Sequence, residues 1–197
     1  MLEVLRTWDA RLFFLINEHW TSPLLDRVLP WLTDARHYTI PFILGALVLL
    51  VAWRLRGLRF LLMAVIGVLI ADAISTHLVK HVFWRTRPCV ALEAVRLLAG
   101  CVNSPSFPSN HAVNGSALAT LAVLHLPKMG PLALALAFVV GYSRVYVGAH
   151  YPLDVLVGSI LGILIALVLS RVMTLIWPPD LGQRERRDPF TLGVRER

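Results

Sequence analysis

Charged residues are scarce in this 197-residue chain, and acidic residues are scarcer than basic ones. Charged residues make up 16% of the sequence and include 12 aspartates and glutamates, whereas 57% of the residues are hydrophobic and the mean hydropathy is +0.67. A typical soluble domain is about a quarter charged and about half apolar. The composition therefore argues against an ordinary soluble domain and predicts a polytopic membrane protein with a single domain.

Three other signals are missing from the chain. No internal repeat or low-complexity segment stands out. No cluster of Asp, Glu and His residues has the spacing of metal ligands, so we expect neither a metal nor another cofactor. Residues 1–20 alternate apolar and charged side chains and lack a small-residue cleavage site, so we expect no cleavable signal peptide.

Basic residues outnumber acidic ones, which gives a net charge of +7 and a pI of about 10.2. On a soluble protein this balance would suggest a nucleic-acid partner. Here the arginines cluster between and after the apolar runs, an arrangement that suits membrane topology. We therefore expect the bilayer, and no nucleic acid, as a partner.

Five apolar segments are long enough, or nearly so, to cross a bilayer, which takes about 20 apolar residues. The preceding stretch, 2–36, is interrupted by charges and divided by Pro23 and Pro30. It predicts one or two amphipathic helices that lie in the interface or pack on the bundle, with a sixth, imperfect span as the alternative. The predicted fold is an all-α, polytopic membrane bundle of five to six transmembrane helices. Its predicted parts are N-terminal amphipathic helices over 1–37, a transmembrane bundle over 38–177 and a basic cytoplasmic tail over 178–197, and its apolar segments are 39–53, 58–79, 111–126, 130–147 and 153–177.

Basic residues fall on one side of a five-span arrangement. Arginines lie between the first two apolar segments, Lys128 follows the third, and further arginines follow the fifth. The positive-inside rule makes that side cytoplasmic. Residues 80–110 and 144–153 then lie on the opposite side of the membrane.

Three polar clusters gather on that opposite side, each at the end of an apolar segment. Their fixed cations are Lys80, Arg87 and Arg144, and the guanidinium fork of arginine matches the oxygens of phosphate. Pro108 and Ser109 before an apolar run predict a helix N-terminus with Ser109 at the N-cap, where backbone N–H groups favour an anion. The sequence therefore predicts a phosphate site.

Two histidines accompany these cations. His150 and Asp154 are four residues apart, and Pro152 suits the first turn of a helix, so Asp154 can reach one nitrogen of His150 and leave the other as a nucleophile. His111 would protonate the leaving oxygen as general acid. Each feature alone is more often structural, but their joint arrangement predicts phosphoryl transfer by double displacement.

The joint pattern resembles the three-part signature of the type 2 phosphatidic acid phosphatase superfamily. That superfamily includes lipid phosphate phosphatases, bacterial acid phosphatases and vanadium haloperoxidases. The matching motifs are Lys80-x6-Arg87-Pro88, Pro108-Ser109-Asn110-His111 and Ser143-Arg144-x5-His150-x3-Asp154.

This resemblance implies a metal-independent reaction with named roles. His150 would be the nucleophile, Asp154 its partner and His111 the acid. The phosphate would be held by Lys80, Arg87, Ser109 and Arg144.

Asn110 departs from the family pattern, which usually has glycine at this position. We expect its backbone N–H to serve the phosphate and its side chain to add a contact that shifts substrate preference. Arg85, two residues before Arg87, is assigned either to the second phosphate of a diphosphate or to a lipid headgroup.

Three residues outside the signature also carry predictions. Asp72 shares a helix face with Thr76 and Lys80, and a structural hydrogen bond to a neighbouring helix is favoured over a functional intramembrane acid. Cys89 and Cys101 bracket a loop on the non-cytoplasmic side, where disulfides persist, so we predict a bond between them.

The sequence thus predicts a lipid phosphatase whose substrate keeps its tails between helices and presents its headgroup to the cations. Polyprenyl diphosphate is favoured over phosphatidylglycerol phosphate, phosphatidic acid and phosphorylated lipid A. The small size and short loops resemble bacterial members of the family, which implies a multi-pass protein of the inner membrane with its site facing the periplasm or the outside. The alternatives are an anion-binding transporter, which would not need the His150–Asp154 pair, and a haloperoxidase that holds vanadate in the phosphate site.

Overall fold

The computed structural model describes residues 2–178, and all regular structure in this part of the chain is helical. The basic tail predicted over 178–197 lies outside the described residues beyond Pro178. The elements are α1 (Leu2–Phe14), η1 (Leu15–His19), α2 (Pro23–Thr33), η2 (Ala35–Tyr38), α3 (Thr39–Ala73), η3 (Ile74–Val79), α4 (Lys80–Val82), α5 (Pro88–Ala91), α6 (Asn110–His125), α7 (Gly130–Tyr146) and α8 (Pro152–Ile176).

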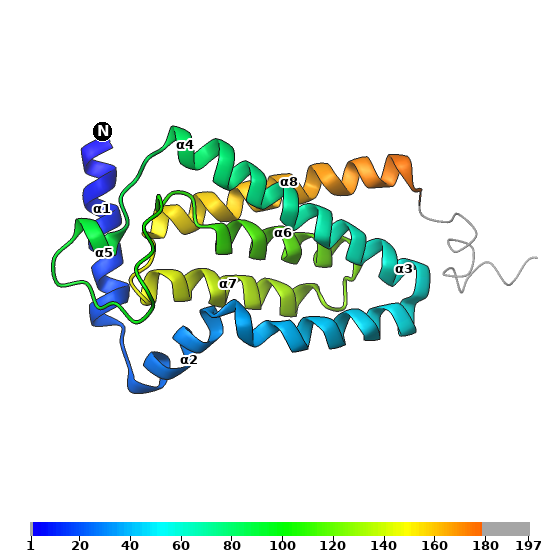
Figure 1. The fold of residues 1–197 in the computed structure, drawn as a ribbon, viewed down its shortest axis with the longest axis horizontal. Coiled ribbons are helices and arrows are strands. Elements are labelled where there is room, and N and C mark those ends of the chain that lie inside the picture. Colours follow the sequence, from blue (N-terminus) through cyan, green and yellow to red (C-terminus); the bar gives the residue numbers. More distant parts are fainter. Residues whose placement is uncertain (1, 179–197) are drawn as a thin grey trace, which may run out of the picture.

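The long helices run side by side along the long axis of the molecule (Figure 1). Helix α3 doubles back at Arg54, whose φ of 45° and ψ of −117° are not helical, so its two limbs correspond to the predicted segments 39–53 and 58–79. Gly57 makes this reversal possible, because a Cβ there would lie 2.1 Å from the carbonyl oxygen of Leu49. The ends of α6, α7 and α8 lie close to the predicted boundaries.

Helix α6 lies at the centre of the bundle and packs against α8, α7 and α3. Its contact with α8 is closest at Gly158 and Gly162, which are spaced by one helical turn. A Cβ on Gly162 would lie 2.1 Å from the carbonyl oxygen of Val113, and one on Gly158 would lie 2.9 Å from that of Ser109. These glycines let the two backbones touch, and they fix the first turn of α6 against the first turns of α8.

Large apolar side chains cover the outer surface of the bundle. Val51 is 80% exposed and Phe138 is 73% exposed, as expected of side chains that face lipid. Two helical stretches within residues 2–178, Arg36–Val82 and Pro152–Ile176, are long and apolar enough to cross a membrane, and α7 is a shorter apolar helix. The described part of the chain is all-helical and has apolar helices suited to a membrane, and the count of five to six spans stays a prediction.

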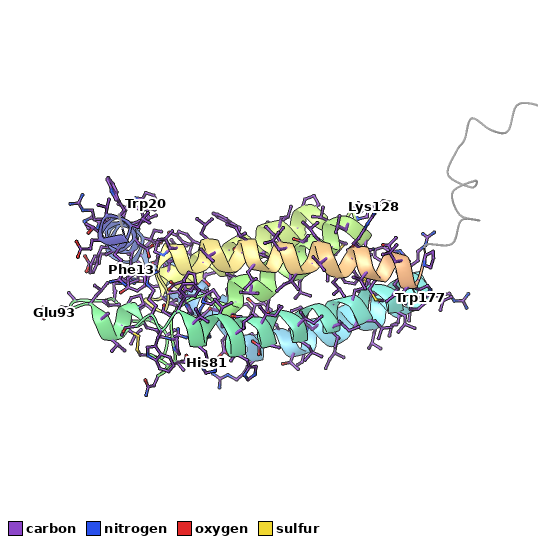
Figure 2. The ribbon with its side chains drawn as sticks, turned by 90° about the horizontal axis from the view of Figure 1, so that it is seen from above. Phe13, Trp20, His81, Glu93, Lys128 and Trp177 are labelled. Carbon is purple, nitrogen blue, oxygen red and sulfur yellow. A yellow bond between two sulfur atoms is a disulfide. The ribbon has the colours of Figure 1, made fainter. Side chains whose placement is uncertain are left out.

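The N-terminal helices cover one end of the bundle. Helix α1 lies across the long axis in Figure 1 and is seen nearly end-on in Figure 2. It buries Phe13 beside Tyr146, Val147 and Tyr151. Helix α1 has 13 residues and continues directly into η1. Its contacts correspond to the predicted packing on the bundle, and whether it forms a sixth span stays open.

Candidate functional site

The three predicted motifs meet at the end of the bundle that α1 covers. Lys80 begins α4, which follows α3 and η3, Arg87 lies in the loop after α4, and Ser109 precedes α6. Arg144 is in the last turn of α7, and the residues after it lead into α8. Because α6 and α8 both begin at this end while α7 finishes there, segments that are distant in the sequence converge (Figure 1).

His150 is buried, and its two ring nitrogens face different groups. Nδ1 lies 3.6 Å from Oδ2 of Asp154 and 3.5 Å from the hydroxyl of Ser106, which itself donates to Asp154. The guanidinium of Arg87 lies on the other side and donates from Nη1 to Nε2 over 3.1 Å. Nε2 therefore acts as the acceptor, which corresponds to a ring that carries its proton on Nδ1.

Burial lowers the pKa of His150 to about 4, against the opposing effect of the Asp154 carboxylate. The ring is then neutral at pH 7, and the lone pair of its Nε2, which here accepts from Arg87, carries no proton. A separation of 3.6 Å is longer than a hydrogen bond, so the predicted pair is close but not in direct contact. Ser106, which lies outside the predicted motifs, provides the intervening hydroxyl.

Asp154 is fully buried, and both of its carboxylate oxygens accept hydrogen bonds. Its Oδ1 accepts from Nη1 of Arg85 over 2.7 Å, and its Oδ2 accepts from the backbone N–H of Tyr151 over 2.9 Å. The second bond closes the first turn of α8 in the manner of a capping box. These bonds hold the carboxylate in one orientation beside His150.

The cations predicted to bind phosphate are nearly buried. Lys80, Arg87 and Arg144 are 9%, 7% and 8% exposed, and among residues 2–178 none of them lies within salt-bridge distance of a carboxylate. Ser104 holds Arg87 in place by accepting from Nε at its carbonyl, over 2.9 Å, and from Nη2 at its hydroxyl, over 3.0 Å. Thr33 accepts from Nη1 of Arg144.

Two of the predicted phosphate-binding groups have buried polar atoms that remain unused. The hydroxyl of Ser109 and Nε of Arg144 have no hydrogen-bond partner within the described part of the chain. Ser109 is the N-cap residue of α6, as predicted, but its side chain does not cap the helix. Buried donors without partners are rare in folded proteins, so both atoms are suited to an anionic ligand.

His111 lies in the first turn of α6, where backbone N–H groups have no intrahelical partner. The charges of Arg144, Arg87 and Lys80 and the ring of His150 are close enough to act on its imidazole. Both predicted catalytic histidines therefore lie near Arg87 and Arg144, and His111 also lies near Lys80. The N-terminus of α6 adds a partial positive charge beside His111.

Asn110 hydrogen-bonds to the neighbouring helix through its side chain. Its amide nitrogen donates to Asp72 over 2.7 Å and to Thr76 over 3.0 Å, and its amide oxygen accepts from Ser75 over 2.7 Å. The amide is thus engaged by α3 and η3, and the expected side-chain contact with substrate stays a prediction. Asp72 forms the favoured structural hydrogen bond between helices.

Arg85 has different partners from either of the two that were predicted. Its guanidinium donates to Asp154 over 2.7 Å and to Asp9 over 2.6 Å, and it stacks on the Tyr151 ring. Two carboxylates contact its two terminal nitrogens, and its assignment to a second phosphate or a headgroup stays a prediction. Asp9 was missed, because an acidic residue in an amphipathic helix carries no local signal of a distant partner.

A disulfide joins Cys89 to Cys101 in the loop that carries the first motif, with the two Cα atoms 6.2 Å apart. The same loop continues to Ser104 and Ser106, which contact Arg87 and Asp154. The disulfide thus restrains a segment that helps to build the site.

An apolar groove of about 570 Å³ lies next to the site, between α1 and the start of α8. Its walls include Leu5, Trp8, Leu12 and Leu156. Asp9 and Leu153 lie at the same groove, and they are hydrogen-bonded to each other over 2.9 Å. The groove therefore reaches the residue that precedes Asp154.

Comparison with known proteins gives a consistent picture. The PAP2 superfamily model matches residues 57–178. The undecaprenyl-diphosphatase BcrC of Bacillus subtilis is 30% identical over 161 residues, which cover 80% of this chain and 79% of that protein. The bacitracin transport permease protein BcrC of Bacillus licheniformis is 38% identical over 125 residues, and the matched part spans 61% of its length. The crystal structure of Aquifex aeolicus LpxE has a TM-score of 0.64 and 27% identity, and the match covers 82% of this chain and 94% of that one.

Proposed function

We propose that this chain, which belongs to the PAP2 superfamily, is a membrane phosphatase that hydrolyses a lipid phosphate or diphosphate through a phospho-histidine on His150. One observation carries the proposal. A buried imidazole whose unprotonated Nε2 faces the guanidinium of Arg87 lies near two further buried cations, and none of the three cations is within salt-bridge distance of a carboxylate in residues 2–178. That combination favours an anionic electrophile over a structural role.

The arrangement supports a double displacement. In the first step, Nε2 of His150 attacks phosphorus, a P–N bond forms, the P–O bond to the leaving group breaks, and His111 gives its proton to the leaving oxygen. In the second step, His111 takes a proton from water as the water oxygen attacks phosphorus. The P–N bond then breaks, and inorganic phosphate leaves.

The cations and the helix terminus stabilise charge on the phosphoryl oxygens in both steps. The unused hydroxyl of Ser109 and Nε of Arg144 provide hydrogen bonds, and the guanidinium of Arg87 lies beside the attacking nitrogen. Asp154 stabilises the imidazolium that develops as His150 forms its new bond. No step is assigned to a metal.

Polyprenyl diphosphate is the proposed substrate. One relative is named an undecaprenyl-diphosphatase, and the apolar groove beside α8 supplies a path for a long hydrocarbon chain next to the site. The fully engaged Arg85 leaves Lys80 and Arg144 as the groups proposed to meet both phosphates.

The site is proposed to face the periplasm or the outside of a bacterial inner membrane. Lys128 and Trp177 lie at one end of the molecule in Figure 2, and His81 and Glu93 lie toward the other. The basic turn between the limbs of α3 is at the end away from the site (Figure 1). The positive-inside rule then assigns the Lys128 end to the cytoplasm.

A transporter remains a second candidate, because one relative is named a transport permease. Purified protein in detergent separates the two functions. We expect phosphate release from polyprenyl diphosphate with the wild type, and a loss of at least 1,000-fold in His150→Ala because the nucleophile is gone. The exposed His77 offers a matched control, and His77→Ala should keep wild-type activity.

The same assay tests which lipid is preferred and whether a metal is required. A panel of phosphatidylglycerol phosphate, phosphatidic acid and phosphorylated lipid A should give lower kcat/KM than the polyprenyl substrate, and activity should survive EDTA. If His150→Ala kept full activity, the phospho-histidine mechanism would be wrong. Binding of the lipid without any phosphate release would favour the transporter.

A further inference from the structure

Arg85 lies between two fully buried carboxylates that are far apart in the sequence. Nη2 is 2.6 Å from Oδ2 of Asp9 in α1, and Nη1 is 2.7 Å from Oδ1 of Asp154 in α8. Both carboxylates have no exposed side-chain surface, whereas Arg85 is 25% exposed. The guanidinium also lies 3.8 Å from the centre of the Tyr151 ring. Arg85 thus has one defined position, which depends on both acids.

Asp9 makes a second contact that also leads to Asp154. Its Oδ1 accepts from the backbone N–H of Leu153 over 2.9 Å. Pro152 begins α8, so this N–H belongs to the first turn, where α8 has no carbonyl of its own to offer. Asp9 therefore holds the backbone immediately before Asp154 with one oxygen and the arginine bound to Asp154 with the other.

The remaining contacts of Asp154 explain why this arrangement matters for the nucleophile. Oδ2 accepts from Tyr151 N–H and from the Ser106 hydroxyl, and it faces Nδ1 of His150. If Arg85 turned away, Oδ1 would lose its only charged partner within residues 2–178, and only the bonds to Oδ2 would orient the carboxylate. The negative charge that faces Nδ1 of His150 would then be less firmly placed.

Burial raises the pKa of the Asp9 carboxyl, and its bonds to Leu153 and Arg85 oppose that effect. A buried acid that served only to attach α1 would be a costly choice, because apolar side chains such as Phe13 already pack there.

We propose that Asp9 is a positioning residue for the phosphoryl-transfer site. It acts through Arg85 and through the first turn of α8 to hold Asp154 against His150. The inference rests on the proposed function, and it makes the N-terminal helix a part of the active site rather than a cover over the bundle.

The test compares Asp9→Asn with Glu3→Gln, which removes an exposed acid from the same helix. Phosphate release gives kcat and KM, and rapid quench with labelled lipid diphosphate gives the rate of phospho-histidine formation. In Asp9→Asn we expect kcat and that rate to fall together by about 10- to 100-fold, with KM changed less than threefold. Glu3→Gln should match the wild type in all three quantities. Asp9→Glu, which keeps the charge, should recover part of the lost rate.

These readouts separate positioning from simple stability, because all rates are measured at least 15 °C below the melting temperature of each variant. If Asp9→Asn does not yield folded protein, Arg85→Lys tests the same link. Lysine keeps the charge but cannot contact both acids at once, and the same fall in kcat is expected. A wild-type kcat in a folded Asp9→Asn or Arg85→Lys protein overturns the inference and leaves the proposed function intact. If the wild type forms no phospho-histidine, the proposed function fails first and the inference fails with it.

Discussion

Gly162 provides a geometric test of how the bundle sets the site. A Cβ at this position would lie 2.1 Å from the carbonyl oxygen of Val113 and 3.0 Å from the amide nitrogen of Ala117, both in α6. Contacts of a Cβ below 3.0 Å are essentially unknown, and both neighbours are backbone atoms that cannot rotate away. In Gly162→Ala, helices α6 and α8 must therefore separate by about 0.9 Å or more at this point.

The expected effect follows from where the two helices lead. Ser109 and His111 belong to the start of α6, whereas Asp154 belongs to the start of α8. Overpacking of this kind typically costs about 1 to 3 kcal/mol in stability. A displacement of about 1 Å between reacting groups can lower the rate by about 100-fold. We expect Gly162→Ala to fold with a lower melting temperature and to lose about 100-fold in kcat.

Gly115 supplies the matched control on α6. A Cβ there would lie 3.8 Å from Ala137, an ordinary contact distance, so Gly115→Ala should keep both stability and activity. Thermal unfolding in detergent and phosphate release from polyprenyl diphosphate would measure the two effects. Equal melting temperatures and equal kcat in the two variants would refute the argument that the α6–α8 contact aligns the site.

Two further predictions concern the nucleophile and the loop. His150, whose pKa is lowered to about 4, should stay neutral as the pH falls from 7 to 5, so the ¹⁵N ring signals absent from His150→Asn should show no titration near pH 6.5. Because the unfolded chain takes up that proton near pH 6.5, the free energy of unfolding should fall as the pH falls from about 6.5 to about 4. A titration midpoint of His150 near pH 6.5 in the folded protein would contradict the assignment. Replacement of Cys89 and Cys101 by serine should lower stability by about 3 kcal/mol, since the bond closes a loop with a sequence separation of 12. Alkylation of both thiols in unreduced, denatured wild-type protein would show that the bond does not form.

Most of the helical layout was accessible from the sequence, because apolar runs with polar ends have few other solutions in a membrane. The limbs of α3 and helices α6, α7 and α8 begin and end within a few residues of the predicted segments. Ser109 was predicted at the N-cap because proline and serine before an apolar run are a local signal, and the structure places it there. Successive spans cross the membrane in alternate directions, so the order of the three motifs along the chain predicted that they lie at the same end of the bundle.

What escaped prediction depends on side-chain partners that are distant in the sequence. Arg85 was assigned to a phosphate or a headgroup because no nearby acid was in view, yet its partner Asp9 is 76 residues away. Asn110 lies within a motif that binds phosphate in the family, but its amide is taken up by Asp72, Thr76 and Ser75 on the neighbouring helix. No pattern of spacing within one segment reports such contacts.

The distribution of carboxylates around the site is itself informative. Arg85 is bound by two of them, whereas Lys80, Arg87 and Arg144 have none within salt-bridge distance in residues 2–178. A carboxylate among those three cations would compete with phosphate for the same donors, and the loss of Asp9 from Arg85 would weaken the hold on Asp154. The carboxylates therefore help to position the nucleophile, whereas the three cations can bind the phosphate of the substrate. Since an unmatched buried charge is costly, the pocket should be least stable without an anion, and phosphate should raise the melting temperature in proportion to its binding.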